Sequence, residues 1–190
     1  MKKFNLSISK TIILLFLSIK PLYSAEMTAP IKVDWSFKGL TGTFDRASLQ
    51  RGFQVYKEVC SSCHSMQYLS YRNLGESGGP EFTEAEVKAI AASFEVTDGP
   101  DSQGEMFTRP GRPSDMFVSP HPNKEAAAAA NGGAYPPDMS VLVKARKGGA
   151  NYIYSVLVGY EDPPPGVTLD QGVYYNKSVS YTHLTLPTKV

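Results

Sequence analysis

The chain has 190 residues, of which 42% are hydrophobic and 19% charged, a balance that is typical of a folded domain and excludes wholesale disorder. Its net charge of +1 includes four lysines and no acidic residue in the first 25 positions, so the remaining sequence holds 15 basic and 18 acidic side chains, a net charge of −3. This mildly acidic balance argues against a nucleic-acid partner, whose phosphates require a basic surface, and would suit a basic protein partner.

The first 25 residues have the three parts of a secretory signal peptide. Lys2 and Lys3 form a basic start, residues 11–19 (TIILLFLSI) form an apolar run, and Ser24 with Ala25 supplies small residues for cleavage. The alternative is a membrane anchor, but nine apolar residues make a helix of roughly 14 Å, about half of the hydrocarbon thickness. We therefore predict that residues 1–25 are a signal peptide and that the domain from residue 26 is exported.

An extended entry segment over residues 26–42 precedes the first predicted helix. Asp45 is a good N-cap residue for that helix. Apolar residues then recur at spacings of four, three and four, which places them on one helical face: Leu49, Phe53, Tyr56 and Cys60. The pattern predicts that this helix delivers Cys60 to the core side.

Residues 82–94 (FTEAEVKAIAASF) predict a second helix. Thr83 and Glu86 form a capping-box pattern at its start. Its expected buried stripe consists of Val87, Ile90, Ala91 and Phe94. Residues 97–122 are rich in proline and glycine and show no periodicity, yet they contain large apolar side chains that need burial. We predict an ordered loop that covers another part of the domain.

Three further helices are predicted downstream. The alanine-rich segment 123–130 stops at Asn131 and two glycines, Asp138 is placed to cap a helix that runs to Lys147, and residues 150–158 form the last helix. We find no internal repeat and no convincing strand alternation. The predicted fold class is therefore mostly α, with long loops rich in proline and glycine.

Cys60, Cys63 and His64 form the pattern C-x-x-C-H, which is typical of c-type haem attachment. On one helical turn the three side chains share a face, so that two thiols can form thioethers with a haem while the imidazole binds its iron. Three alternatives remain open: a thioredoxin-like dithiol, a zinc site with one more ligand, and a plain disulfide. The haem interpretation is favoured because the export signal, the motif and the preceding helix agree independently.

Residues 44–74 (FDRASLQRGFQVYKEVCSSCHSMQYLSYRNL) resemble cytochrome c1, the haem subunit of the cytochrome bc1 complex. Further matching runs follow in the same order at residues 104–115, 123–149 and 151–167. The resemblance covers roughly residues 33–177, and it is to bacterial proteins close to the mitochondrial type. Because it extends over several ordered segments, it is far more specific than the C-x-x-C-H motif alone.

The resemblance implies a cytochrome c-like fold over residues 26–177 with one covalent haem c, attached to Cys60 and Cys63 and ligated by His64. It implies electron transfer from a Rieske iron–sulfur protein to a soluble or membrane-anchored cytochrome c, with cytochrome b as a further partner in ubiquinol–cytochrome c reductase. The chain would then be an electron-transfer subunit that is not catalytic alone. The family lies at the periplasmic face of the bacterial inner membrane through an anchor that this sequence lacks, so the chain as given would be soluble and periplasmic.

Two other functions remain as alternatives to this resemblance. The first is a free-standing exported c-type cytochrome that works outside the bc1 complex. The second, from a different class, is an exported C-x-x-C thiol-disulfide oxidoreductase. Both alternatives keep the export signal and the cysteine motif. In the first, the two cysteines bind haem; in the second, they act as a redox dithiol.

The resemblance also assigns residues outside the motif. Arg109 is expected near a haem propionate, and the expected pocket lining consists of Asn131, Ala134 and Pro137. The family's second axial ligand is a methionine in a Met-Pro segment that this sequence does not contain, so we assign no sixth ligand, and we expect His121 at the surface. The likeness stops at about Lys177, so we expect residues 178–190 to be a non-native tail.

Overall fold

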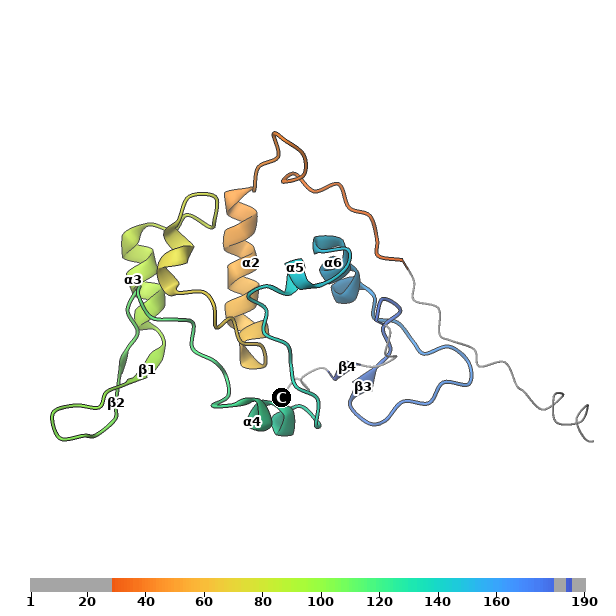
Figure 1. Ribbon diagram of the computed structural model, residues 1–190. Coiled ribbons are helices and arrows are strands. Elements are labelled where there is room, and N and C mark those ends of the chain that lie inside the picture. Colours follow the sequence, from red (N-terminus) through yellow and green to blue (C-terminus); the bar gives the residue numbers. More distant parts are fainter. Residues whose placement is uncertain (1–28, 180–183, 186–190) are drawn as a thin grey trace, which may run out of the picture.

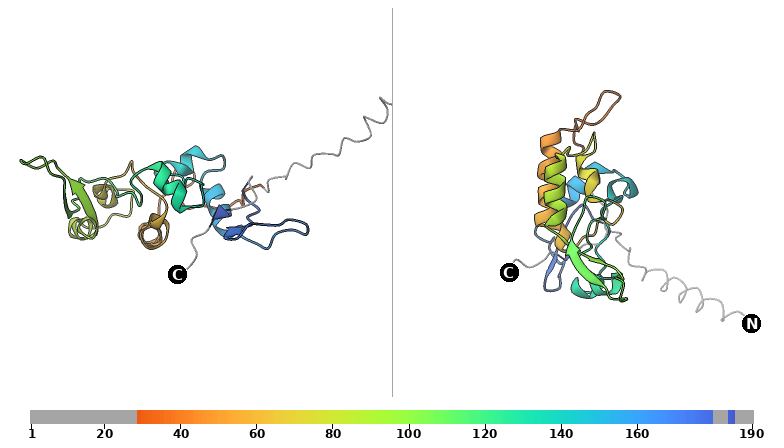
Figure 2. Two further views of the ribbon diagram at one scale, coloured as in Figure 1. Left: turned by 90° about the horizontal axis from the view of Figure 1, so that it is seen from below. Right: turned by 90° about the vertical axis from the view of Figure 1, so that its left-hand side faces the viewer.

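The computed structural model describes residues 29–179 and 184–185, so the predicted signal peptide and most of the predicted tail lie outside the described residues. The long helix α2 (Arg46–Glu58) stands at the centre, with α3 (Glu84–Ala92) on one side of it and α5 (Leu142–Ala145) with α6 (Ala150–Val158) on the other (Figure 1). The view from below keeps this order, and the other view looks along it, so the described elements form an elongated row rather than a ball (Figure 2).

The remaining elements are short. Two 3₁₀ helices span Cys60–Ser62 and Tyr71–Gly75, and α4 spans Lys124–Ala130. The strands pair in two antiparallel hairpins, β1 (Glu95–Asp98) with β2 (Phe107–Pro110) and β3 (Val173–Tyr174) with β4 (Leu184–Thr185). A helix-rich architecture with few and short strands agrees with the predicted mostly-α class.

The two helix starts predicted from local sequence are confirmed. The Asp45 carboxylate accepts a hydrogen bond of 2.7 Å from the Ser48 amide at the start of α2. At the start of α3, Glu86 Oε2 accepts from the Thr83 amide at 2.7 Å, and Thr83 Oγ1 accepts from the Glu86 amide at 3.3 Å. These bonds satisfy amide groups that have no partner within their own helix.

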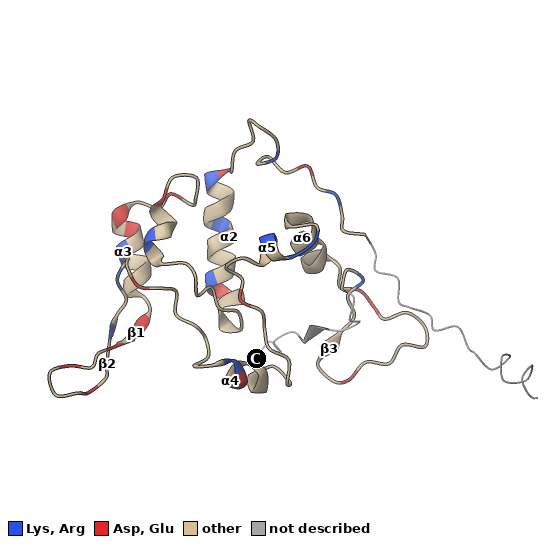
Figure 3. Ribbon diagram, in the orientation of Figure 1, with Lys and Arg blue, Asp and Glu red and all other residues tan. Residues whose placement is uncertain are grey.

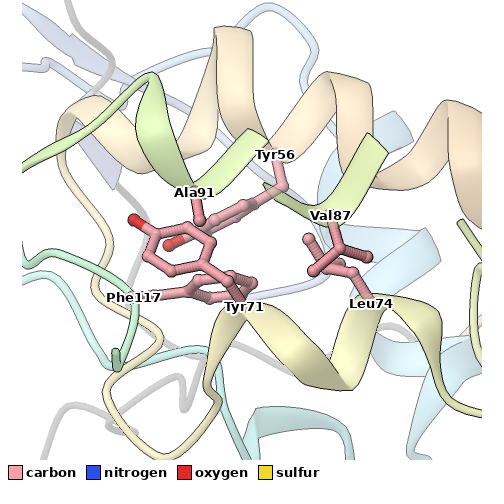
Figure 4. Close-up of a cluster of buried hydrophobic side chains, with 6 residues drawn as sticks. All are labelled: Tyr56, Tyr71, Leu74, Val87, Ala91 and Phe117. Atoms are coloured by element: carbon pink, nitrogen blue, oxygen red, sulfur yellow. The ribbon is translucent and has the colours of Figure 1, made fainter. Parts of the chain in front are cut away.

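The core lies between α2, α3 and the 3₁₀ helix at residues 71–75. It consists of Tyr56, Tyr71, Leu74, Val87, Ala91 and Phe117 (Figure 4). Phe117 comes from the segment predicted to be a covering loop, and its ring meets that of Tyr71 edge-on with centroids 4.7 Å apart. The expectation that this segment supplies buried apolar side chains is therefore confirmed for Phe117, whereas Met106, Phe107 and Met116 are exposed.

Two predictions about elements are wrong. Residues 95–98 and 107–110, for which no strand was predicted, form the β1–β2 hairpin, in which Val96 faces Arg109. Four-residue strands are too short to reveal an alternating pattern in the sequence. The helix expected from Asp138 to Lys147 is reduced to α5, and the Asp138 carboxylate bonds to residues 65 and 67 as well as to the Ser140 amide.

A membrane-spanning helix was also sought in the structure. Within residues 29–179 and 184–185, no helix combines the length and the apolar character that crossing a bilayer requires.

Candidate functional site

The cysteine motif lies in one tight turn that continues directly from α2. The Cys60 carbonyl oxygen accepts the amide hydrogens of both Cys63, at 3.1 Å, and His64, at 2.8 Å. Both cysteines are half-buried and carry free thiols. The sequence folds this way because the 3₁₀ helix Cys60–Ser62 tightens the end of α2, and the result gathers two thiols and one imidazole within five residues.

His64 is held by three hydrogen bonds from different parts of the chain. Its amide bonds to Cys60, its carbonyl oxygen accepts from the Tyr56 hydroxyl at 3.2 Å, and its Nδ1 lies 2.8 Å from the Pro137 carbonyl oxygen. A carbonyl oxygen only accepts, so the Nδ1 atom must carry the proton. In the neutral imidazole, Nε2 then keeps a lone pair, which is the form in which histidine binds a metal.

A small hollow of about 100 Å³ opens beside Cys63. Its lining comes from the motif, from the segment before α4, and from the turn after α4; it includes Cys63, Pro120, His121, Ala127, Tyr135 and Pro136. His121, expected at the surface, is half-buried here instead. The hollow therefore places a small space of mixed polar and apolar lining next to one of the two thiols.

The three predicted pocket residues after α4 take different positions. Pro137 meets the motif through its carbonyl bond to His64. Asn131 donates from Nδ2 to the Ala134 carbonyl oxygen at 2.8 Å, which shapes the turn that leads to Pro137. Ala134 is exposed. The structure thus brings Pro137 to the histidine, while Asn131 and Ala134 belong to the turn that positions it.

Arg109 lies on β2 and is engaged by two carboxylates. Its guanidinium bonds to Asp98 through Nε and to both oxygens of Asp115, through Nη1 at 2.6 Å and through Nη2 at 3.0 Å. Nη1 also donates to the Pro110 carbonyl oxygen. These bonds give Arg109 a structural role at the hairpin that the sequence did not predict. One N–H group of the guanidinium takes no part in them. Its placement near a haem propionate stays a prediction.

The Arg109–Asp115 pair predicts a loss of stability in acid. Hydrogen bonding by Arg109 lowers the pKa of Asp115 from 3.8 to about 2. Because the folded state lowers this pKa, the pair stabilises the fold above about pH 4, and its contribution disappears as pH falls from about 4 to about 2. We expect Asp115→Asn to reduce the free energy of unfolding at pH 7 by on the order of 1–2 kcal/mol, a range that allows for solvent screening.

Denaturant unfolding of the parent and of Asp115→Asn at pH 7, 4 and 2.5 would measure this effect. The difference between them should shrink towards zero at the lowest pH, whereas the exposed Asp170→Asn should match the parent throughout. A difference that is constant over this range would contradict the assignment.

Two residues that support the turn, Tyr56 and Asp138, were not identified in that role from the sequence. Tyr56 precedes Cys60 by four residues on the same helical face, so its position next to the motif could have been inferred from spacing. Asp138 gave no such signal, because its partners are more than 70 positions away in the sequence.

The alternatives for the two cysteines differ in what they require of the structure. Burial and the neighbouring Cys63 raise the pKa of the Cys60 thiol, the opposite of the low pKa that makes a dithiol reactive. Among the residues that the structure describes, no three His, Cys, Asp or Glu side chains are grouped so as to hold a metal ion. The free thiols and the lone pair left on His64 Nε2 suit a covalently attached metal-containing cofactor better than a redox dithiol.

Comparison with known proteins gives a consistent result. The matching family is described as "Cytochrome C1 family", and the match covers residues 35–190. "Cytochrome c1-2, heme protein, mitochondrial" of Solanum tuberosum is 54% identical over 142 residues, which are 75% of this chain and 54% of that protein. "Cytochrome c1" of Rhodospirillum rubrum is 57% identical over 135 residues, which are 71% of this chain and 48% of that protein.

A third relative has a composite name. "Cytochrome b/c1" of Bradyrhizobium diazoefficiens is 49% identical over 162 residues, which are 75% of this chain and 24% of that protein. The chain thus spans about half the length of the first two relatives, and less of this one.

Proposed function

The chain belongs to the cytochrome c1 family, and from this premise we propose that it carries one covalent haem c and transfers electrons as a subunit of the cytochrome bc1 complex. One observation carries the proposal: the hydrogen bond between His64 Nδ1 and the Pro137 carbonyl oxygen leaves Nε2 available for iron, in the same turn that holds two free thiols. A cytochrome c-like fold around this turn is part of the proposal.

The residues present fit a haem. Cys60 and Cys63 would hold it through thioethers, and His64 would be its axial ligand. Haem, when bound, supplies one-electron redox chemistry. The protein's own contribution is to orient the imidazole through Tyr56 and Pro137.

The partners are proposed from the family. A Rieske iron–sulfur protein would donate the electron, a soluble or membrane-anchored cytochrome c would accept it, and cytochrome b would be the neighbouring subunit. The net charge of −3 beyond residue 25 would favour a basic acceptor, and acidic residues lie on α3 and along the β1–β2 hairpin (red in Figure 3). We further propose export through residues 1–25 and a location on the periplasmic side of the membrane.

Covalent attachment is the decisive test of the haem. The chain would be produced with residues 1–25 in a bacterium that has the c-type maturation machinery. The purified product should keep its haem on a denaturing gel, because thioethers survive denaturation. A colourless product with two titratable thiols would refute the proposal and favour a thiol-disulfide oxidoreductase.

Electron transfer is tested separately with the haem-loaded protein. Its reduced form should be oxidised by a basic cytochrome c at a rate that falls steeply with added salt, since screening weakens charge attraction. Co-purification with a cytochrome b-containing complex would favour the subunit over a free-standing cytochrome.

A further inference from the structure

Residues 65–68 and residues 138–140 are joined side by side by hydrogen bonds, although they lie more than 70 positions apart in the sequence. The Met139 amide donates to the Ser65 carbonyl oxygen at 2.8 Å, and the Tyr68 amide donates to Ser140 Oγ at 3.1 Å. One segment directly follows His64, and the other directly follows Pro137. We call these two paired segments the junction.

The Asp138 carboxylate is the centre of the junction. Its Oδ2 accepts from Ser65 Oγ at 2.7 Å and from the Gln67 amide at 2.9 Å, and its Oδ1 accepts from the Ser140 amide at 2.9 Å. One side chain therefore bonds to both segments of the junction. No ion pair involves this carboxylate among the described residues, so these hydrogen bonds are what support its charge.

The junction sets the geometry of the neighbouring hydrogen bond. The proline ring fixes φ of Pro137, so the direction of its carbonyl depends on where the next residue, Asp138, is held. The imidazole likewise extends from a residue whose successor, Ser65, is bonded to Asp138. From this arrangement we infer that Asp138 is a positioning residue for His64, because it fixes both ends of the bond between the imidazole and the Pro137 carbonyl oxygen.

A carboxylate suits this position because every partner is a donor. Two backbone amides and one hydroxyl point at it, and an ionised carboxylate only accepts. Asparagine has the same shape but would turn an NH₂ group towards one of these donors and leave it unpaired. Burial alone would raise the pKa of Asp138, yet the bonds from Gln67, Ser140 and Ser65 outweigh it and hold the pKa below its usual value.

The inference deepens the proposed function and rests on it, because His64 matters as an iron ligand. A hydrogen bond from the far ring nitrogen makes a ligating imidazole a stronger electron donor, which favours oxidised iron. A looser bond in an Asp138 variant should therefore favour the reduced form. A purely structural aspartate would change the stability of the fold and leave this property unaltered.

The test uses the full haem-loaded chain with ¹⁵N-labelled histidine, reduced and held low-spin by added carbon monoxide as the sixth ligand. In Asp138→Asn we expect the His64 Nδ1–H proton to exchange with solvent about tenfold faster than in the parent. The redox equilibrium against a mediator dye should shift towards the reduced protein. Ser65→Ala, which removes one of the donors to Asp138, should change both quantities in the same direction by less, and it serves if Asp138→Asn does not accumulate.

Asp101→Asn is the matched control. Asp101 also accepts two backbone amides, from Gln103 at 2.8 Å and from Glu105 at 3.0 Å, but in the loop of the β1–β2 hairpin. It should lower stability without altering proton exchange or redox equilibrium. Parental exchange and parental redox equilibrium in both Asp138→Asn and Ser65→Ala, with covalent haem present, would overturn the inference alone. Absence of covalent haem from the parent would overturn the proposed function as well.

Discussion

Replacing both Cys60 and Cys63 with serine is expected to reduce haem staining on a denaturing gel to background, because a serine hydroxyl does not form the thioether that a thiol does. Each single variant should retain one thioether and therefore some stain. Cys60→Ser should also lower stability by roughly 1 kcal/mol. The Cys60 side chain packs against the core cluster, and a serine hydroxyl there would lack a hydrogen-bond partner.

Ser61 and Ser62, the residues between the two cysteines, provide the control. Their hydroxyls donate to carbonyl oxygens of α2 and its C-cap, Lys57 and Val59; that of Ser62 also lies 3.7 Å from Cys63 Sγ, so Ser61 is the cleaner control. Ser61→Ala and Ser62→Ala should stain like the parent, and intact mass should rise by one haem in both. Undiminished staining of the double cysteine variant would show that the pigment is held by other residues.

Replacing Tyr71 with alanine is expected to reduce the free energy of unfolding by about 3–5 kcal/mol, the range found for removing a large buried ring. Tyr71 is 1% exposed, and its ring lies with centroids 4.7 Å from that of Phe117 and 5.2 Å from that of Phe94. Its removal leaves a cavity where α2, α3 and the 3₁₀ helix of residues 71–75 meet. Guanidinium unfolding followed by circular dichroism would measure the loss.

Tyr71→Phe separates the ring from the hydroxyl. The hydroxyl accepts only a long bond of 3.4 Å from the Val118 amide, so its removal should cost less than about 1 kcal/mol. If both variants lost similar amounts, the hydroxyl rather than ring packing would stabilise this region. If neither lost more than about 1 kcal/mol, this cluster would not be the core that limits unfolding.

Features that depend on neighbouring residues could be predicted from the sequence. The caps at Asp45 and Thr83 need only the next three residues, and residues 150–158 form α6 as the pattern predicted. The turn that holds Cys60, Cys63 and His64 also follows from spacing alone. In each case the interacting groups lie within one or two helical turns, where chain geometry leaves few alternatives.

Features that depend on distant partners could not be predicted in this way. Asp138 is a good cap by local chemistry, but donors at residues 65 and 67 bind its Oδ2, and only Oδ1 bonds locally, to the Ser140 amide. Arg109 is expected near a haem propionate from the resemblance, and nothing in the sequence indicated that the hairpin places Asp98 beside it and that a turn brings Asp115. Which carboxylate meets which donor is decided by the fold, and the sequence pattern does not contain that information.

Tyr56 connects the hydrophobic core with the turn that holds the cysteine motif. Its ring packs with Phe117 in the core, while its hydroxyl bonds to the carbonyl oxygen of His64. Melting of the hydrophobic centre should therefore release His64, the proposed iron ligand, at the same time. In the haem-loaded protein the visible spectrum would then report on the core, so that damage in α3, which makes no hydrogen bond to the motif within the described residues, would be seen as a change of colour.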